Sequence, residues 1–177
     1  FKPVNWCLDC RSSLAEAEVE YEDKTSDSID VRFAVREPAE LARRMGSDVV
    51  PPAVDVIIWT TTPWTLPANL AVSVHPEHDY ALIEGEGRWF VIAQEMMDSV
   101  RERWDISAPW TVHASAKGSA LDRLVLAHPF AARDSLLING DHVTLDAGTG
   151  CVHTAPAHGV EDFEICRQYG IEVVNPV

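Results

Sequence analysis

The sequence predicts a mainly β domain with a few peripheral helices, an α+β architecture with a barrel-like sheet. Short runs of strand length recur along the 177 residues, whereas only three segments have helical character. The alternation of strands and helices that is typical of a nucleotide-binding sheet is missing from the pattern, as is any G-x-G-x-x-G motif. Hydrophobic residues make up 46% and charged residues 24% of the chain, which is the composition of a globular domain.

The length corresponds to one ordinary domain, and we expect a single unit over 1–177 with a linker at 1–13 that carries a C-x-x-C pair. Because the chain opens at Phe1, we expect an excised insertion of a larger protein. The net charge of −14 disfavours autonomous, non-specific binding to nucleic acid. Apolar runs such as 54–59 are too short to span a bilayer.

The first half of the chain contains a predicted hairpin, a helix and a buried strand. Segments 15–21 and 29–35 alternate small or apolar residues with charged ones, and the polar stretch 23–28 separates them. A short helix is expected over 39–45, opened by Pro38 and closed by Gly46. The β-branched run 54–61 is typical of a buried strand. Two prolines make 62–69 irregular in this prediction.

The second half continues with short strands and two helices. Strands are expected over 70–74, 80–83, 89–92, 112–116 and 121–126, with a hairpin turn at 85–87. Two more, over 142–145 and 151–154, are joined through 146–150. Helices are expected over 94–104 and 160–169, the second capped by Gly170. This makes nine or ten strands and three helices in all.

Two segments have a composition that indicates chemistry. In 59–69, hydroxyls, two indoles and an amide crowd onto a proline-braced turn, although threonine is also an ordinary strand residue. In 148–163, a glycine-rich turn precedes His153, His158 and Asp162. Each has a structural alternative: Asp162 can favour a helix dipole, His153 can be a hydrogen-bonded core residue, and His158 can be an exposed loop residue.

Three kinds of chemistry compete at the second segment. His153 and His158 with Glu161 or Asp162 could bind zinc, but their spacing fits no established ligand pattern. Cys151 and His153 could act as nucleophile and base, since residues i and i+2 of a strand share a face, but no third orienting group is evident. The third interpretation is a polar substrate pocket without a nucleophile, in which hydroxyls orient a water and a carboxylate binds an ammonium group.

The run WTTTPWTLPAN at 59–69, followed about eighty residues later by GTGCVHTAPAHG at 148–159, resembles the inserted editing domain, or connective peptide 1, of bacterial isoleucyl-tRNA synthetases. Segments 4–10, 14–21 and 141–146 match as well, so the resemblance covers essentially the whole chain. Related valyl and leucyl enzymes carry Arg after the second threonine, where this chain has Thr62. Ala157 and Glu161 differ from the usual Gly and Asp without removing the chemistry.

The resemblance implies hydrolysis of valine wrongly attached to the isoleucine tRNA, with valyl-adenylate as a second candidate substrate. One methylene group changes binding by only about 1–3 kcal/mol, and isoleucine against valine is the standard illustration, so a second, smaller pocket must remove the error. The resemblance implies that Thr60, Thr61 and Thr62 position the ester and the attacking water. It also implies that His153 helps to form the wall that excludes the larger side chain of isoleucine, and that Asp162 binds the α-ammonium group of valine. Further predicted substrate contacts are Trp59, Trp64, Leu66, Pro67, Asn69, His158 and Gly159.

The resemblance also implies partners and cofactors. Editing needs no cofactor, and ATP and Mg²⁺ belong to the rest of the synthetase. Cys7 and Cys10 form half of a four-cysteine zinc site whose other half would lie outside the chain, so we expect no zinc here. The expected partners are the 3′ end of the isoleucine tRNA carrying valine and the remaining synthetase chain, in a cytoplasmic monomer without membrane contact.

Two alternatives of other classes stay open. One is a non-catalytic module that binds the tRNA end. The other is a metal- or thiol-dependent hydrolase that uses His153, His158 and Cys151.

Overall fold

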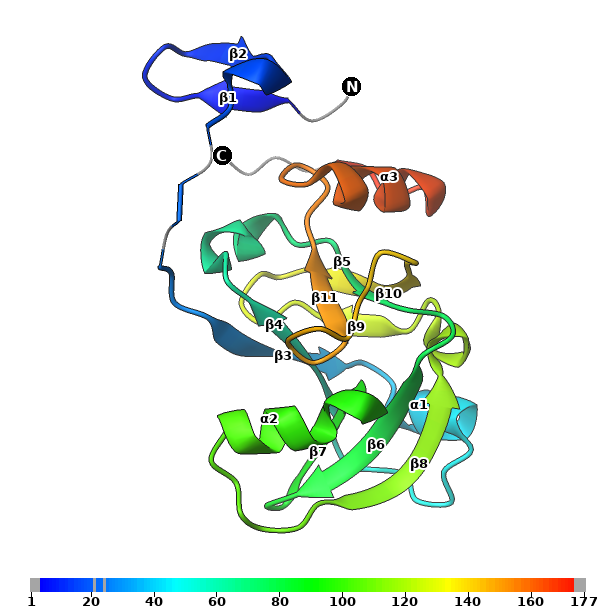
Figure 1. The fold of residues 1–177 in the computed structure, drawn as a ribbon. Helices are drawn as coiled ribbons and strands as arrows, with labels where there is room; N and C mark the ends of the chain where they lie inside the picture. The colour runs from blue at the N-terminus through cyan, green and yellow to red at the C-terminus, as the bar shows by residue number, and fades with distance from the viewer. Residues whose placement is uncertain (1–3, 21, 24, 174–177) are drawn as a thin grey trace.

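The computed structural model describes residues 4–20, 22–23 and 25–173, arranged as Figure 1 shows. A two-stranded hairpin of β1 (Asn5–Cys7) and β2 (Ser12–Leu14) stands apart from the main body. The body is built on a nine-stranded sheet of β3 (Ile29–Val35), β4 (Asp55–Thr60), β5 (Ala71–Val74), β6 (Asp79–Gly85), β7 (Arg88–Ala93), β8 (Thr111–Lys117), β9 (Val125–Ala127), β10 (Asp134–Asn139) and β11 (Cys151–Thr154). The mainly β class is confirmed.

Short helices lie outside this sheet (Figure 1). The α-helices are α1 (Pro38–Met45), α2 (Met97–Arg103) and α3 (Val160–Gln168). The 3-10 helices are η1 (Glu16–Glu18), η2 (Pro63–Ala68), η3 (Gln94–Met96) and η4 (Gly118–Leu121). Among the described residues, no helix is long and apolar enough to cross a membrane.

The strand order β11-β5-β10-β9-β3-β4-β7-β6-β8 is mixed, because β10 runs parallel to β5 and β4 runs parallel to β7. The sheet curls, so that β11 at one edge comes back beside β4. Thr149 Oγ1, just before β11, donates to the Ile57 carbonyl of β4 at 2.7 Å and helps to hold this approach. The curl explains the barrel-like character that the sequence predicts.

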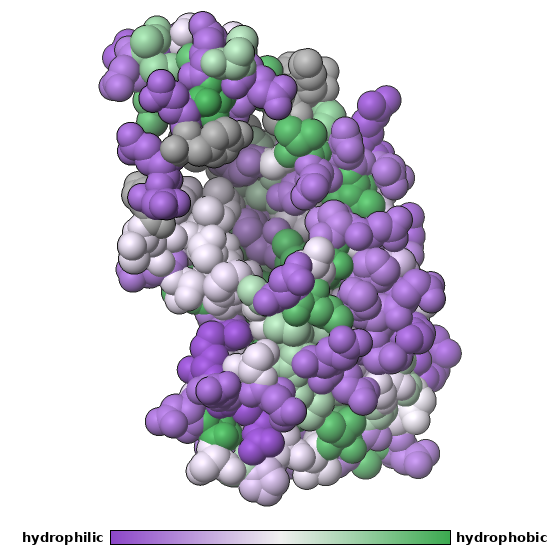
Figure 2. Space-filling model, viewed as in Figure 1, coloured by the Kyte–Doolittle hydropathy of each residue, from purple (hydrophilic) through white to green (hydrophobic). Residues whose placement is uncertain are grey.

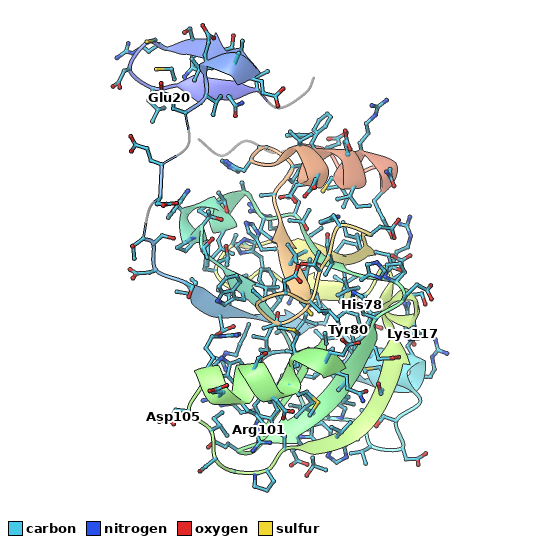
Figure 3. The ribbon with its side chains drawn as sticks, in the orientation of Figure 1. Glu20, His78, Tyr80, Arg101, Asp105 and Lys117 are labelled. Atoms are coloured by element: carbon cyan, nitrogen blue, oxygen red, sulfur yellow. The ribbon has the colours of Figure 1, made fainter. Side chains whose placement is uncertain are left out.

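The hydrophobic core is one cluster of buried side chains from the strands of the sheet and from α1, α2, η2, η3 and η4. The run in β4 is buried because both faces of this central strand are covered, as its β-branched composition predicts. Tyr80 in β6, labelled in Figure 3, is fully buried, and its hydroxyl donates to the Gly150 carbonyl at 2.7 Å while accepting from the His75 N–H. This contact ties the turn before β11 to the core.

The predicted hairpin of 15–21 with 29–35 is wrong. Residues 16–18 form η1, while Tyr21 lies outside the described residues, and β3 pairs with β4 and β9 instead. All three residues of η1 are exposed, so the alternation there has no apolar face to bury against the body. The predicted linker at 1–13 contains β1 and most of β2.

Three further expectations need correction. Segment 62–69 is regular: η2 forms there because Pro63 occupies the first helical position, where a missing N–H is harmless. The expected strand 121–126 is divided into the end of η4 and the short β9. Segment 142–145 forms no strand, and β10 lies in a segment for which no strand was predicted. The other predicted strands and the three predicted helices are confirmed within a few residues.

Candidate functional site

A cavity of about 370 Å³ opens where β4 runs into η2. It is enclosed by the two segments of unusual composition, which the curl of the sheet brings together. Figure 2 shows the surface hollowed at this level, below the β1–β2 hairpin and between η2 and α3. The lining residues are Trp59, Thr60, Thr61, Thr62, His142, Thr144, Asp146, Ala147, Gly148, Thr149, Gly150, Cys151, Val152, His153 and Glu161.

His153 is the most constrained side chain of this cavity. It sits in β11 with 8% exposure, and both ring nitrogens are bonded: Nδ1 to Asn69 Nδ2 and Nε2 to Thr65 Oγ1, each at 2.8 Å. An amide nitrogen can only donate, so Nδ1 accepts and the proton resides on Nε2. The Thr65 hydroxyl accepts it and donates to the Thr62 carbonyl at 2.8 Å. The ring is therefore fixed in one orientation and one tautomer.

The network behind His153 is buried and complete. Asn69 is fully buried; its Nδ2 also donates to the Ala71 carbonyl at 2.7 Å, and its Oδ1 accepts from Ser135 Oγ at 2.5 Å. Burial lowers the pKa of His153 to about 4, with further lowering from the nearby imidazoles of His158 and His128. At neutral pH the imidazole is uncharged, and neither nitrogen is free to take a proton. His153 can shape the cavity but cannot act as its general base in this arrangement.

The threonines of the segment 60–62 line the same cavity. Thr60 ends β4 and is buried, and its Oγ1 lies 3.2 Å from Thr62 Oγ1 and accepts from the Thr62 N–H at 3.0 Å. Thr61 and Thr62 are exposed at the start of η2, so their hydroxyls can reach a ligand. Hydroxyls both donate and accept, which suits them to orient a water and an ester carbonyl.

Asp162 lies beside the cavity rather than in its lining. It occupies the first turn of α3, and its Oδ2 accepts from the Ala155 N–H, just past β11, at 2.8 Å. Its other oxygen accepts no hydrogen bond from the described residues. Burial raises the pKa of Asp162, while the Ala155 bond and the nearby His142 oppose that rise. A Cβ at Gly159 would stand 3.2 Å from the Asp162 carboxyl carbon, so the glycine leaves room for this carboxylate.

The remaining predicted contacts lie outside the lining. Trp64 is 65% exposed on η2, and His158 is exposed in the loop before α3. Leu66 is buried and Pro67 is exposed; their carbonyls accept from His128 and Arg133, respectively. These two carbonyl contacts hold η2 in place, and none of the four residues is among those that line the cavity.

Five polar residues of the site were not predicted from the sequence: Thr65, His142, Thr144, Asp146 and Thr149. Thr65 and Thr149 act through the hydrogen bonds already described. His142 lines the cavity, and its buried Nε2 has no hydrogen-bond partner among the described residues. The hydroxyl density of 60–65 was a usable signal for Thr65, whereas His142 was hidden in a segment assigned to a strand.

The two thiols near the site are poor nucleophiles. Cys151 is 2% exposed, and burial raises the pKa of its thiol far above the usual range. Burial also raises the pKa of the Cys166 thiol to about 12. In contrast, Cys10 is exposed in the β1–β2 turn, and its N–H donates to Cys7 Sγ at 3.2 Å, which lowers the pKa of Cys7. Over the described residues, no three His, Cys, Asp or Glu side chains gather to hold a metal ion.

Comparisons with known proteins identify the family of the chain. The family described as tRNA synthetases class I (I, L, M and V) matches residues 1–121. An isoleucine–tRNA ligase of Dichelobacter nodosus is 66% identical over 177 residues, which are 100% of this chain and 19% of that protein. One from Sodalis glossinidius is 57% identical over 99% of this chain and 19% of its own length. The chain thus spans about a fifth of these curated relatives.

Solved structures with the same fold are much more distant in sequence. The editing domain of P. knowlesi cytosolic leucyl-tRNA synthetase superposes with a TM-score of 0.67 at 11% identity, over 87% of this chain and 68% of that one. The corresponding P. falciparum domain gives 0.68 at 10% identity, over 82% and 68%. At such low identities the likeness establishes the fold.

Proposed function

The chain belongs to the class I tRNA synthetases of the I, L, M and V group, and from this membership we propose that it is an editing domain that hydrolyses valine from misacylated isoleucine tRNA. The cavity between the threonine segment and β11 would hold the aminoacyl ester. Valyl-adenylate would be a second substrate of the same cavity.

The observation that carries the proposal is that the locked, uncharged His153 and the exposed residues Thr61 and Thr62 line one small cavity. A rigid wall discriminates by size, because its side chain cannot move aside for one more methylene group. A network in which every buried partner is satisfied supplies that rigidity. Isoleucine would be excluded by this wall, while valine would be held against the hydroxyls of Thr61 and Thr62.

The chemistry proposed is attack by water on the ester carbonyl. The bond from the carbonyl carbon to the ribose oxygen breaks, which releases valine and restores the ribose hydroxyl. Positioning of the water by threonine hydroxyls lowers the entropic part of the barrier, and donors near the carbonyl stabilise the oxyanion. The free oxygen of Asp162 would bind the α-ammonium group of valine, a charge-assisted contact of about 1.5–3 kcal/mol. No enzyme nucleophile is required.

The experiment is deacylation of valyl-tRNA(Ile) beside isoleucyl-tRNA(Ile), with chelator present. We expect loss of the valyl ester only. Asp162→Asn keeps an oxygen acceptor for the Ala155 N–H but removes the charge, so we expect about a tenfold or larger fall in kcat/KM. Glu164→Gln removes a neighbouring charge from an exposed position on α3 and should leave the rate unchanged.

Three outcomes would count against all or part of the proposal. Equal loss of both esters would show that the cavity does not select by size. Absence of hydrolysis by this chain, together with full editing by a synthetase carrying Asp162→Asn, would exclude a role for this carboxylate. Hydrolysis that stops with chelator or with Cys151→Ala would instead favour the metal- or thiol-dependent alternative.

The proposal extends to the whole protein. A single editing unit over 1–177 would be part of a longer cytoplasmic synthetase, which would supply ATP and Mg²⁺ chemistry and most of the contacts to tRNA. The net charge of −14 is consistent with a domain that binds only the flexible end of the RNA.

A further inference from the structure

A second pocket, of about 310 Å³, lies on the outer face of β3, β4 and β7, covered by the loop that follows α2. Figure 3 labels Arg101 and Asp105 at the end of α2 and the start of this loop. The pocket walls are mainly aromatic, and charged side chains stand at the floor and rim. The lining residues are Asp30, Arg32, Asp55, Ile57, Gly85, Glu86, Arg88, Trp89, Phe90, Trp104, Ile106 and Trp110.

The aromatic walls are mutually packed. The rings of Phe90, Trp104 and Trp110 contact one another with centroids 5.0–5.7 Å apart. A Cβ at Gly85 would stand only 2.5 Å from Trp110 Cδ1, so only glycine lets the indole approach the β6–β7 turn this closely. Trp104 Nε1 donates to Asp30 at 2.7 Å, which fixes the second indole. The side chains of the pocket walls are therefore held in place, and they present flat apolar surfaces that suit a planar ring.

The pocket floor offers one acceptor and one donor side by side. Asp55 is half-buried and accepts no hydrogen bond from the described residues; its nearest cation is Arg32, with Nη1 at 3.9 Å from Oδ2. Of the other carboxylates, Asp30 is already bonded to Arg103 and Trp104, and Glu86 stands exposed at the rim. Asp55 and Arg32 remain available to a ligand edge that carries an amine next to an acceptor.

The pocket adjoins the proposed editing cavity. Ile57 lines the aromatic pocket and Trp59 lines the cavity, and these residues point to the same face of β4, about 7 Å apart. Between the two sites, Arg103 pairs with Asp30 at 2.8 Å and donates to the Gly148 carbonyl at 3.4 Å. The two sites are therefore neighbours along β4.

We propose that the aromatic pocket binds an unpaired nucleobase that carries an exocyclic amine, from the RNA strand whose esterified end occupies the threonine–histidine cavity. The base stacks on the tryptophans, Asp55 accepts from its amine, and Arg32 donates to the adjacent ring acceptor. Exposed Arg88 at the rim stands where it can meet a phosphate. The inference deepens the proposed function, since it rests on RNA entering the neighbouring cavity.

The test is a fluorescence titration of the chain with cytidine and uridine 5′-monophosphates. Three of the six tryptophans line the pocket, so binding is directly visible. We expect saturation with the cytidine nucleotide and at least tenfold weaker binding of the uridine nucleotide, whose carbonyl would face Asp55. Both carry the same phosphate, so the ratio isolates the base.

Variants make the test specific. Asp55→Asn should weaken cytidine binding about tenfold, whereas Asp79→Asn, an exposed strand carboxylate paired with Lys117, should not change it. If Asp55→Asn unfolds, judged by circular dichroism, Arg32→Gln replaces it with the same expectation. Equal binding of the two nucleotides, no saturable signal, or unchanged binding by the folded variants would overturn the inference.

Failure of this inference is distinguishable from failure of the proposed function. The titration contains no ester, so a chain without hydrolytic activity can still show the cytidine preference. A chain that edits valyl-tRNA(Ile) but shows no preference would refute the nucleobase pocket alone.

Discussion

Replacing Asn69 by alanine should be among the most damaging single changes in the chain, although the residue is invisible from the surface. Its side chain is fully buried and makes three hydrogen bonds, to the Ala71 carbonyl, His153 Nδ1 and Ser135 Oγ. A typical bond of this kind contributes about 1 kcal/mol net, so their loss costs about 3 kcal/mol. The groups left without partners are buried, which makes this a lower bound.

The measurement is the free energy of unfolding from urea titration, followed by tryptophan fluorescence. Asn139→Ala is the matched control, because Asn139 in β10 makes one side-chain bond, from Nδ2 to the Gly118 carbonyl at 3.0 Å, and should lose only about 1 kcal/mol. A loss for Asn69→Ala no greater than that of the control would refute the view that this network holds η2, β5, β10 and β11 together.

Three more predictions concern His153, Thr149 and the four cysteines. His153 has a folded-state pKa of about 4 against 6.5 for an ordinary histidine, so the unfolded chain binds the proton first and the free energy of unfolding falls by about 3 kcal/mol in all as the pH drops from 6.5 to 4. Urea titrations at pH 7 and pH 5 should show this fall in stability. An equal fall in a His153→Gln variant would contradict the prediction. Thr149→Val keeps the shape of the side chain but removes its hydrogen bond to the Ile57 carbonyl, so the free energy of unfolding should fall by about 1–3 kcal/mol in the same assay. An unchanged urea midpoint would mean that this bond does not hold β11 beside β4. Iodoacetamide at pH 8 should label the partly exposed Cys7 and the exposed Cys10 and spare Cys151 and Cys166 in the native chain, as mass spectrometry would show. Rapid labelling of all four cysteines without denaturant would count against the burial of Cys151 and Cys166.

Patterns local in sequence predicted local structure well. The β-branched run of β4 and the turn at Gly87 between β6 and β7 were both found, because strand propensity and turn chemistry are properties of neighbouring residues. The strand β10 was missed because its six residues carry little alternation and gain their stability from pairing with β5, over sixty residues earlier, and with β9. Pairing between segments so far apart produces no pattern within a short stretch of sequence.

For the candidate site too, features local in sequence were predicted and contacts between distant segments were not. Unusual composition located the threonine segment and the segment around His153, but their meeting across one cavity depends on β11 pairing with β5. Ser135, which completes the network behind Asn69, stands in the overlooked β10. Asp162 was found by its place in a family motif, and its position beside the lining required the structure.

The late position of β11 in the chain sets the order in which the cavity can be assembled. His153 pairs in register with Val72, so the part of the cavity wall that β11 forms closes a loop of about eighty residues. Contacts so distant in sequence form after local hairpins such as β6–β7, because the chain loses more entropy in closing the longer loop. During synthesis from the N-terminus, most of the sheet can therefore be present while the cavity still lacks one side. A ribosome-bound chain stopped before Cys151 should hold a folded β6–β7 hairpin and no binding site.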